Sequence, residues 1–394
     1  MAEREIVILS GVRTAIGDYG GALKDIAPSE LAAQVIREAV KRASIEPKQV
    51  GALALGNVIH TEAKDMYISR VAALKAGLSQ ESTAVTVNRL CGSGLQAIVS
   101  AAQMIMLGDA DVAVGAGAES MSRAGYLVPA LRWGQRMGDG SVVDMMVGAL
   151  TDPFDTVHMG ITAENIAAQW KISREDQDAF AVESHRRAIQ AIEKGHFRDQ
   201  ILPIELKTRK GVTVFDKDEH PRADASLEGM AKLRAAFKKD GSVTAGNASG
   251  INDGAAAVVL MEKSAAAKQG LKPMARLVSY GLAGVDPKIM GIGPVPACTV
   301  ALERAGLKIG DIDVVEANEA FAVQAMAVAC DLKFDPKKTN PNGGAVGLGH
   351  PIGATGALLT VKAIHELQRS GGRYALVTMC IGGGQGIAAV FERL

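Results

Sequence analysis

A repeat of the chain within itself constrains its fold more than any other sequence feature. Residues 39–45 resemble residues 301–307, which lie 262 positions later. The same offset places 91–94 on 353–356, at the start of a helical pattern rich in alanine and leucine in each copy. Because one offset relates several separate segments, the sequence predicts two homologous halves.

The first of these halves contains an insertion. Residues 254–262 resemble residues 386–392 at the smaller offset of 132, which leaves 130 extra residues in the first copy. The inserted region also differs in composition, since it holds both tryptophans, Trp133 and Trp170, and a charged stretch. We therefore predict three parts: residues 1–120 plus 251–270 form the first half, residues 121–250 form an inserted loop domain, and residues 271–394 form the second half.

Short apolar runs alternate with helical patterns in each half, which is typical of an α/β fold. In the first half the expected elements are a strand at 6–9, a helix at 29–43 capped by Pro28-Ser29, a strand at 52–55, a helix at 91–107 and a strand at 112–114. This alternation predicts helices on the faces of mixed or parallel sheets. Two such halves packed together predict five layers in the order α-β-α-β-α.

Composition and charge exclude several classes of protein. The 43 Lys and Arg residues balance the 43 Asp and Glu residues, so no overall field attracts nucleic acid or an anionic membrane surface. No window approaches about 18 uninterrupted apolar residues, and the run at 6–9 is too short for a secretory signal, so no membrane span is expected. The four cysteines are far apart, without a CxxC pair or zinc-finger spacing, which predicts reduced thiols in a cytoplasmic protein without a metal site.

Cys91 is a candidate nucleophile. It follows an extended run and a turn, and an alanine-rich helix is expected to begin at the cysteine itself. Because backbone N–H groups at a helix N-terminus stabilise a thiolate, this position predicts a lowered thiol pKa and donors for an oxyanion. The alternative is a small residue packed where a helix meets a strand.

Three further segments combine a reactive side chain with a turn. His350 lies in the glycine-rich stretch 342–356 and is a candidate general base, although such a stretch could instead cradle a phosphate. Cys380 follows an expected strand and precedes a run of glycines, where a substrate can approach it. Asn318 follows another expected strand and either caps the next helix or presents its amide to a water or a carbonyl oxygen.

Together these segments resemble the thiolase family, and the resemblance covers essentially the whole chain. The matching motifs are the loop around Cys91, Asn318-Glu319-Ala320-Phe321, Gly349-His350-Pro351, Cys380-Ile381-Gly382-Gly383-Gly384, and the segments 158–165 and 244–250. The likeness is greatest to bacterial acetyl-CoA acetyltransferases and short-chain β-ketothiolases. It implies duplicated α/β halves in five layers, with the inserted loop domain serving CoA binding and oligomer contacts.

The chemistry that the resemblance implies is reversible Claisen condensation. Two acetyl-CoA molecules give acetoacetyl-CoA and CoA by a ping-pong route through an acetylated cysteine. Cys91 is then the nucleophile, His350 takes its proton, and Cys380 moves the proton at C2 of the second acetyl-CoA. His350 and a water held by Asn318 stabilise the enolate, while the backbone N–H groups of Cys91 and Gly382 form a second oxyanion hole. No cofactor or metal is expected, because the CoA thioesters are substrates.

The resemblance also assigns residues to coenzyme A. The matching positions are His158, Met159 and Ser249 around the pantetheine, Met290 beside the acyl pocket, and Arg222 for the adenosine phosphates. The segment 219–223 departs from the family's usual sequence, so a solvated surface arginine is the alternative for Arg222. The basic residues Lys207, Arg209 and Lys210 either add attraction for the phosphates or form a solvated face.

Several alternatives stay open at the level of sequence. The resemblance implies a homotetramer with 123–137 as a contact segment, but composition does not distinguish a dimer from a tetramer. A broader 3-ketoacyl-CoA thiolase, working in fatty acid breakdown or in polyhydroxyalkanoate precursor synthesis, is the alternative substrate class. A non-catalytic CoA- or lipid-binding relative is a more remote one. A decarboxylating ketoacyl synthase would share the duplicated fold but lacks a second catalytic cysteine such as Cys380.

Overall fold

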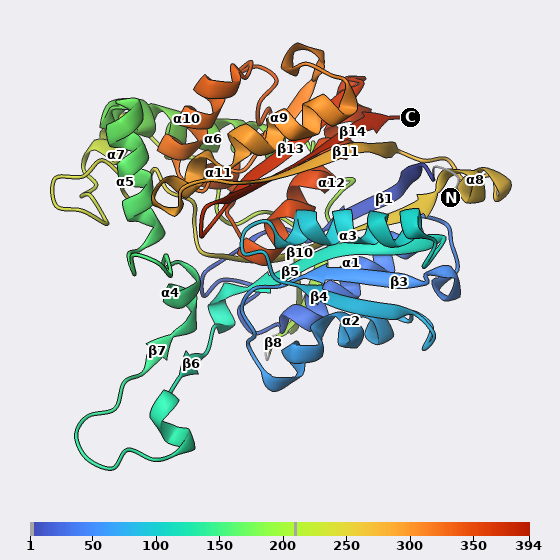
Figure 1. Ribbon diagram of the computed structural model, residues 1–394, viewed down its shortest axis with the longest axis horizontal. Coiled ribbons are helices and arrows are strands. Elements are labelled where there is room, and N and C mark those ends of the chain that lie inside the picture. The colour runs from blue at the N-terminus through green and yellow to red at the C-terminus, as the bar shows by residue number, and fades with distance from the viewer. Residues whose placement is uncertain (1–3, 209–210) are drawn as a thin grey trace.

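Two half-sheets joined edge to edge form the centre of the computed structural model, which describes residues 4–208 and 211–394 (Figure 1). The hydrogen-bonded strand order is β12-β13-β14-β11-β1-β10-β5-β3-β4, with the short β2 (Gly17–Asp18) beside β10. The first half contributes β1 (Ile6–Arg13), β3 (Ala52–Gly56), β4 (Thr83–Val87), β5 (Val112–Ser120) and β10 (Asn252–Glu262). The second half contributes β11 (Ala275–Gly284), β12 (Val314–Ala317), β13 (Tyr374–Ile381) and β14 (Gln385–Arg393). The halves join through β1 and β11, where Val7 pairs with Arg276 and Ile8 with Ala275.

Helices cover both half-sheets and also fill the space between them. In the first half, α1 (Pro28–Arg42) and α2 (Ile68–Ala76) pack on one face. In the middle, α3 (Ser93–Leu107) and α12 (Ile352–Ser370) pack against each other and against strands of both halves, while α9 (Pro294–Ala305) covers β11 and β14. The predicted α-β-α-β-α order is therefore confirmed. The helix α1 begins at Pro28, and Ser29 is buried in its first turn rather than capping it.

Several elements recur at the offset found in the sequence, and others do not. The strands β3 and β12 start 262 residues apart, and so do β5 and β13. The strand β4 has no such counterpart, because the corresponding region of the second half forms the short helix α11 (Ala345–Leu348). The two copies therefore diverge at the segment that leads to Cys91 in one and to His350 in the other.

Glycines allow α3 and α12 to cross almost in backbone contact. A Cβ atom at Gly94 would lie 2.7 Å from Ala357 N, and a Cβ at Gly356 would lie 2.2 Å from Leu95 N. Both contacts are shorter than any side chain tolerates, so the crossing depends on glycine. Because Cys91 and His350 each precede one of these helices by two residues, the close crossing brings their loops together.

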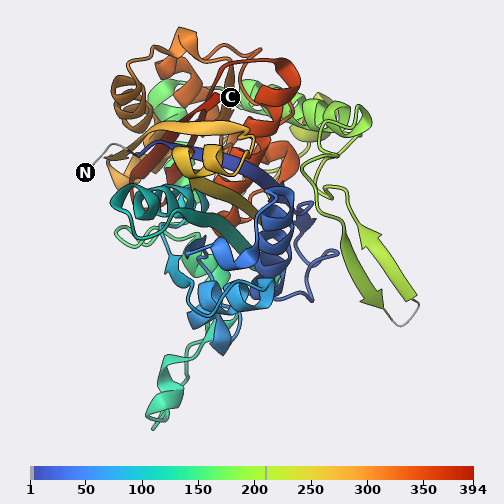
Figure 2. The same ribbon diagram turned by 90° about the vertical axis from the view of Figure 1, so that its right-hand side faces the viewer.

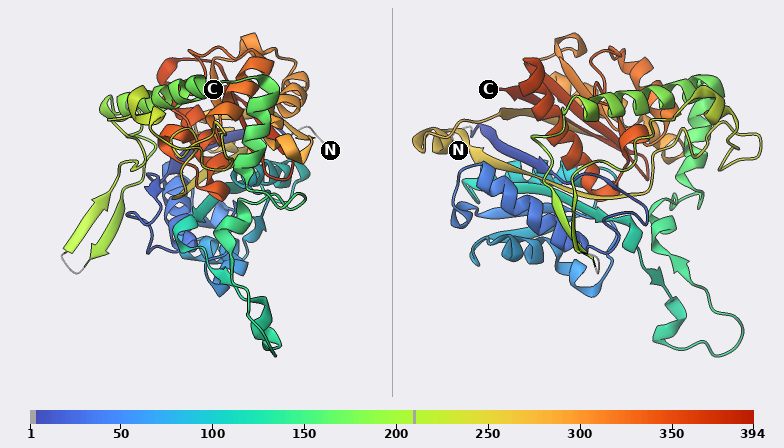
Figure 3. Two further views of the ribbon diagram at one scale, coloured as in Figure 1. Left: turned by 90° about the vertical axis from the view of Figure 1, so that its left-hand side faces the viewer. Right: turned by 180° about the vertical axis from the view of Figure 1, so that it is seen from behind.

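The inserted region lies outside the layered body. It contains α4 (Met145–Ala149), α5 (Met159–Trp170), α6 (Arg174–Glu193) and α7 (Leu227–Ala231). It also contains the paired strands β6 (Tyr126–Leu127) and β7 (Val143–Asp144), and β8 (Ile204–Thr208) and β9 (Gly211–Phe215). Figures 2 and 3 show that both strand pairs extend away from the body. The remaining helices are α8 (Lys263–Lys268) and α10 (Ala322–Leu332).

One described helix has the length and composition to cross a membrane. The window Leu90–Leu107, which contains α3, passes this test, but 61% of it is buried inside the fold. Since α3 forms the middle layer between the half-sheets, its apolar character is explained by packing.

Candidate active site

Cys91 lies on a strained turn two residues before α3. The preceding Leu90 has a positive φ of 43°, which costs free energy for a leucine and is typical of functional turns. The hydroxyl of Ser93 closes the turn, donating to Leu90 O at 2.6 Å and accepting from Arg89 N at 2.9 Å. The predicted helix start at Cys91 is therefore wrong by two residues, because the turn occupies the positions before Ser93.

The environment of the Cys91 thiol also differs from the prediction. Burial raises its pKa to about 11, the backbone amides of Gly382 and of Cys91 itself lower it in part, and the nearby Glu119 raises it. The expected lowering of the pKa is thus wrong, since the loss of hydration outweighs the two amide bonds. A thiol in this state needs a base to remove its proton. The same two amides are the donors that were predicted to form an oxyanion hole.

Cys380 lies beside the loop of Cys91, and the region around these two residues is the reactive pocket. It is fully buried near the end of β13, and its pKa is raised by burial first and by the charge of Cys91 second. The strand of Cys380 ends beside the loop of Cys91 although the residues are far apart in the chain, since a Cβ at Gly92 would lie 2.6 Å from Cδ1 of Ile381, the residue after Cys380. Met159 and Leu90 pack closely on Gly382, because a Cβ there would lie 2.8 Å from Met159 Cε and 3.1 Å from Leu90 Cδ1.

His350 is a buried, neutral imidazole. It is 5% exposed, and burial lowers its pKa to about 4, so the ring carries no charge at neutral pH. Its Nδ1 lies 2.6 Å from Thr355 Oγ1, and its Nε2 lies 3.4 Å from Asn318 Nδ2. Its backbone N–H donates to Asn252 Oδ1 at 2.9 Å. The following Ile352 belongs to the small apolar cluster against which Cys91 packs.

Asn318 lies between His350 and the strand that carries Cys380. Its backbone N–H donates to Thr378 O at 2.9 Å, two residues before Cys380. The helix α10 begins at Ala322 with Phe321 at its N-cap, without a side-chain cap. The interpretation of Asn318 as a helix cap is therefore wrong, and its buried amide is available to the pocket.

Four of the residues assigned to coenzyme A surround this pocket. His158 caps α5, where its Nδ1 accepts from Gly160 N at 3.0 Å, and its ring stacks on Phe237 at 4.5 Å. Met159 and Met290 belong to the same buried apolar cluster as Cys380. The backbone N–H of Ser249 donates to Ala320 O at 3.0 Å, two residues after Asn318.

Arg222 lies further out, at a second cavity. This cavity has a volume of about 350 Å³ and is lined by Arg222, His185, His220, Ser226, Ala245 and Ala248 among others. Ala248, which adjoins Ser249 in the chain, and the exposed Arg222 both line this cavity. Lys207 is exposed, whereas Arg209 and Lys210 lie outside the described residues.

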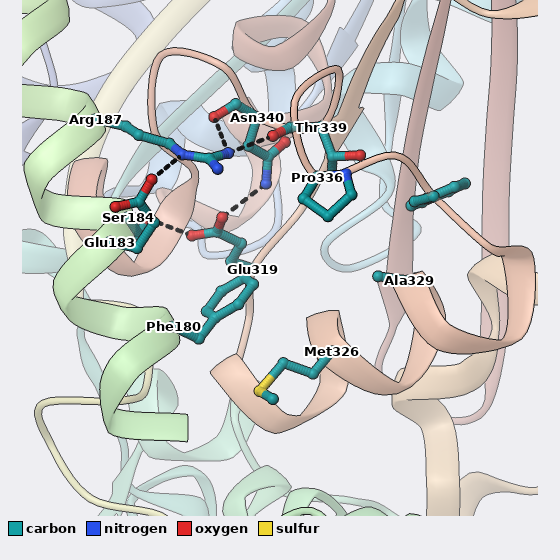
Figure 4. A pocket seen from close by; sticks show the side chains of 11 residues that line it. Phe180, Glu183, Ser184, Arg187, Glu319, Met326, Ala329, Pro336, Thr339 and Asn340 are labelled. Carbon is teal, nitrogen blue, oxygen red and sulfur yellow. Dashed lines mark hydrogen bonds and ion pairs between the residues drawn. The ribbon is translucent and has the colours of Figure 1, made fainter. Parts of the chain in front are cut away.

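An apolar pocket of similar volume does not coincide with these residues. Figure 4 shows this pocket, about 350 Å³ between α6 and α10, lined by Phe180, Met326 and Pro336 among others. None of the three predicted reactive side chains lines it. Its inner end is formed by Glu319, which accepts from Ser184 Oγ at 2.6 Å and from Asn340 Nδ2 at 2.7 Å. The pocket therefore touches the active site only through the residue after Asn318.

Glu119 is a buried acidic residue near the reactive side chains that the sequence did not single out. Glu119 is fully buried and accepts from the backbone N–H groups of Val58, Ile59 and Gly353, at 3.1, 3.1 and 2.8 Å. Burial raises its pKa to about 7. It ties the first half to the N-terminus of α12 beneath Cys91. An acidic residue at the end of an apolar strand was the available signal for it.

Among the described residues, no group of three or more His, Cys, Asp or Glu side chains is placed to hold a metal ion. The reactive groups that the structure brings together are thus two thiols, an imidazole and an amide. These groups can carry out acyl transfer to sulfur and proton transfer.

Comparisons with known proteins agree with this chemistry. Residues 6–264 match the family model of the thiolase N-terminal domain, and residues 271–393 match that of the thiolase C-terminal domain. The chain is 66% identical over 392 residues to the beta-ketothiolase BktB of Cupriavidus necator, covering 99% of this chain and 100% of that protein. It is 51% identical over 396 residues to an acetyl-CoA acetyltransferase of Syntrophomonas wolfei, covering 99% of this chain and 100% of that protein.

Solved structures of related proteins have the same fold as this chain. The acetyl-CoA acetyltransferase of Bacillus anthracis has a TM-score of 0.98 at 50% identity, with 100% of both chains covered. Human mitochondrial 3-ketoacyl-CoA thiolase in complex with CoA has a TM-score of 0.97 at 44% identity, with 99% of this chain and 98% of that chain covered.

Proposed function

The chain belongs to the thiolase family and is an acyltransferase, and we propose that Cys91, His350, Cys380 and Asn318 carry out its reaction. The observation that carries this proposal is the close approach of the Cys91 loop to the end of the Cys380 strand, where a Cβ at Gly92 would lie 2.6 Å from Cδ1 of Ile381. One thiol forms the covalent bond and the other moves the proton.

The first half-reaction acetylates Cys91. Because His350 is neutral, its imidazole has a lone pair that can take the proton of Cys91. The raised pKa of the thiol and the lowered pKa of the imidazole disfavour an ion pair before the substrate binds, so we expect the proton to move together with attack on the thioester carbonyl. The tetrahedral oxyanion is held by the backbone N–H groups of Cys91 and Gly382, the two amides that already bond the sulfur. The departing CoA thiolate takes a proton from Cys380, which leaves a thiolate there.

The second half-reaction uses that thiolate as the base. It removes a proton from C2 of a second acetyl-CoA, and burial suits Cys380 to this step because a thiol of raised pKa gives a more basic thiolate. The enolate is stabilised by the protonated His350 and by a water on Asn318. Attack of the enolate on acetyl-Cys91 gives acetoacetyl-CoA, and His350 returns its proton to the Cys91 sulfur, so all protons balance.

For the substrates, we propose acetyl-CoA, acetoacetyl-CoA and CoA, with 3-ketoacyl-CoA esters of greater length as the second candidate. The identity to a beta-ketothiolase favours the second, and the identity to acetyl-CoA acetyltransferases favours the first. His158, Met159, Ser249 and Met290 would contact the pantetheine and acyl group, and Arg222 the phosphates. The kcat/KM values for thiolysis of acetoacetyl-, β-ketovaleryl- and β-ketohexanoyl-CoA distinguish the two candidate substrate classes. A steep fall beyond the four-carbon substrate supports the first candidate, and equal or rising values support the second.

For the assembly, we propose a cytoplasmic homotetramer that needs no cofactor. The segment 123–137 projects from the body and exposes Leu131, Trp133 and Met137, at 77%, 91% and 88%. Apolar side chains this exposed are typical of contact surfaces. Light scattering measures the oligomeric state of the wild type and of Trp133→Ser. A tetrameric wild type and a smaller Trp133→Ser assembly are expected, and a monomeric wild type contradicts the proposed tetramer.

A further inference from the structure

A hydrogen-bonded chain on one side of the His350 ring determines which ring nitrogen carries the proton. Nδ1 lies 2.6 Å from Thr355 Oγ1, and this hydroxyl donates to Pro351 O at 2.9 Å. Thr355 is 2% exposed in the first turn of α12. Because the hydroxyl has a single proton and gives it to the carbonyl, its lone pair accepts from Nδ1–H.

The opposite nitrogen of the ring is then free of a proton in the neutral state. Its neighbour is Asn318 Nδ2, at 3.4 Å, which is a donor and so fits an Nε2 lone pair. The two partners therefore favour the same tautomer from both sides of the ring.

We propose that Thr355 is a positioning residue that holds His350 in the Nδ1–H tautomer, so that Nε2 accepts the proton of Cys91. The S–H bond of Cys91 breaks, an N–H bond forms at Nε2, and the Nδ1–H bond to Thr355 persists in the resulting imidazolium. The same Nε2–H then points at the oxygen of the second substrate. This inference rests on the proposed role of His350 as the base.

The internal repeat supports a dedicated use of this hydroxyl. The counterpart of Thr355 is Ser93, 262 positions earlier. Ser93 Oγ donates to Leu90 O at 2.6 Å and accepts from Arg89 N at 2.9 Å. Both hydroxyls donate to a backbone carbonyl at the start of their helix, but the second copy directs the accepting lone pair to an imidazole instead of a backbone amide.

The test removes the hydroxyl at nearly constant volume. In Thr355→Val, the single-turnover rate of Cys91 acetylation by radiolabelled acetyl-CoA is expected to fall on the order of 10- to 100-fold, since a fraction of the ring then presents Nε2–H to the thiol. The acetyl-CoA concentration at half-maximal rate is expected to stay unchanged, because Thr355 is buried and its hydroxyl is bonded to His350 and to Pro351 O. Thr355→Ser is expected to restore most of the rate.

Thr360→Val is the matched control. Thr360 lies five residues further along α12, is fully buried, and donates its hydroxyl to Gly356 O at 2.8 Å. Its replacement therefore removes a similar backbone bond without touching the imidazole, and the acetylation rate is expected to stay at the wild-type value.

Two results overturn the inference: a Thr355→Val rate equal to wild type, or an equal loss in Thr360→Val. If Thr355→Val does not fold, Thr355→Ala is expected to show the same loss relative to Thr355→Ser, and equal rates in that pair overturn the inference. His350→Ala separates the two levels of the argument. Wild-type acetylation in His350→Ala refutes the proposed base, whereas a slow His350→Ala together with a fast Thr355→Val refutes the role of Thr355 alone.

Discussion

Replacement of Glu319 by alanine is expected to destabilise the fold by about 3 kcal/mol. Glu319 is 2% exposed and accepts from Ser184 Oγ, Asn340 Nδ2 and Val346 N, at 2.6, 2.7 and 3.1 Å. These donors come from α6, from the segment after α10 and from α11. The carboxylate therefore joins the inserted domain to the loop that carries His350.

The size of this destabilisation follows from the hydrogen bonds that each donor keeps after the carboxylate is removed. Asn340 Nδ2 keeps its bond to Ala317 O at 2.9 Å, and the Ser184 hydroxyl keeps only Gly344 O at 3.5 Å. The Val346 N–H loses its acceptor. A buried donor without a partner costs about 1–3 kcal/mol, and water entering from the adjoining pocket offsets part of the cost, so two affected donors give about 3 kcal/mol. Glu319→Gln is expected to cost about half of this, because it keeps one accepting oxygen.

Urea unfolding, followed by circular dichroism at one fixed protein concentration, measures the effect, since the midpoint of an oligomer depends on concentration. Glu183→Ala is the matched control, because Glu183 lines the same pocket in Figure 4 but its side chain is 39% exposed and paired with Arg186 and Arg187. Exposed ion pairs contribute about 0–1 kcal/mol. A Glu319→Ala variant as stable as Glu183→Ala refutes the reasoning.

Three further predictions concern the reactive pocket. Cys91→Ala is expected to acquire no label from radiolabelled acetyl-CoA, whereas Cys380→Ala is expected to become acetylated and fail to condense; label at another residue, or rapid condensation by Cys380→Ala, contradicts the division of roles. The pKa of His350 is lowered to about 4, so its contribution to stability is complete above the unfolded value of about 6.5 and is lost as the pH falls toward 4, by up to about 3 kcal/mol. His350→Asn is therefore expected to flatten the pH dependence of urea unfolding between pH 6.5 and 4, and an unchanged slope contradicts this. Gly356→Ala places a Cβ 2.2 Å from Leu95 N, so a loss of about 2 kcal/mol or more in the same assay is expected, and wild-type stability contradicts the close crossing of α3 and α12.

The fold was accessible from the sequence because duplication leaves a long-range signal. One offset related segments of both halves, and β3 and β12, or β5 and β13, differ in position by that same 262 residues. The environment of the reactive groups was harder to predict from the sequence. A local pattern predicts where a helix lies, but the start of α3 at Ser93 depends on a hydroxyl that closes the turn behind Cys91. The pKa of Cys91 depends on burial between two halves that are distant in the chain, which no local window contains.

The same duplication explains how two equivalent positions came to hold different chemistry. In the first copy α3 starts at Ser93, and the residues before it form the strained turn of Leu90 and Cys91. In the second copy α12 starts at Ile352, three residues earlier than the offset places it. This extra turn lets Gly353 N–H reach Glu119 and brings Thr355 back to His350. Asn88, the counterpart of His350, instead braces the turn by accepting from Leu90 N at 3.0 Å. A small shift in where the helix begins therefore gives a thiol on a strained, partly buried turn in one copy and a hydrogen-bonded imidazole in the other, and the glycine crossing of α3 and α12 brings the two loops together.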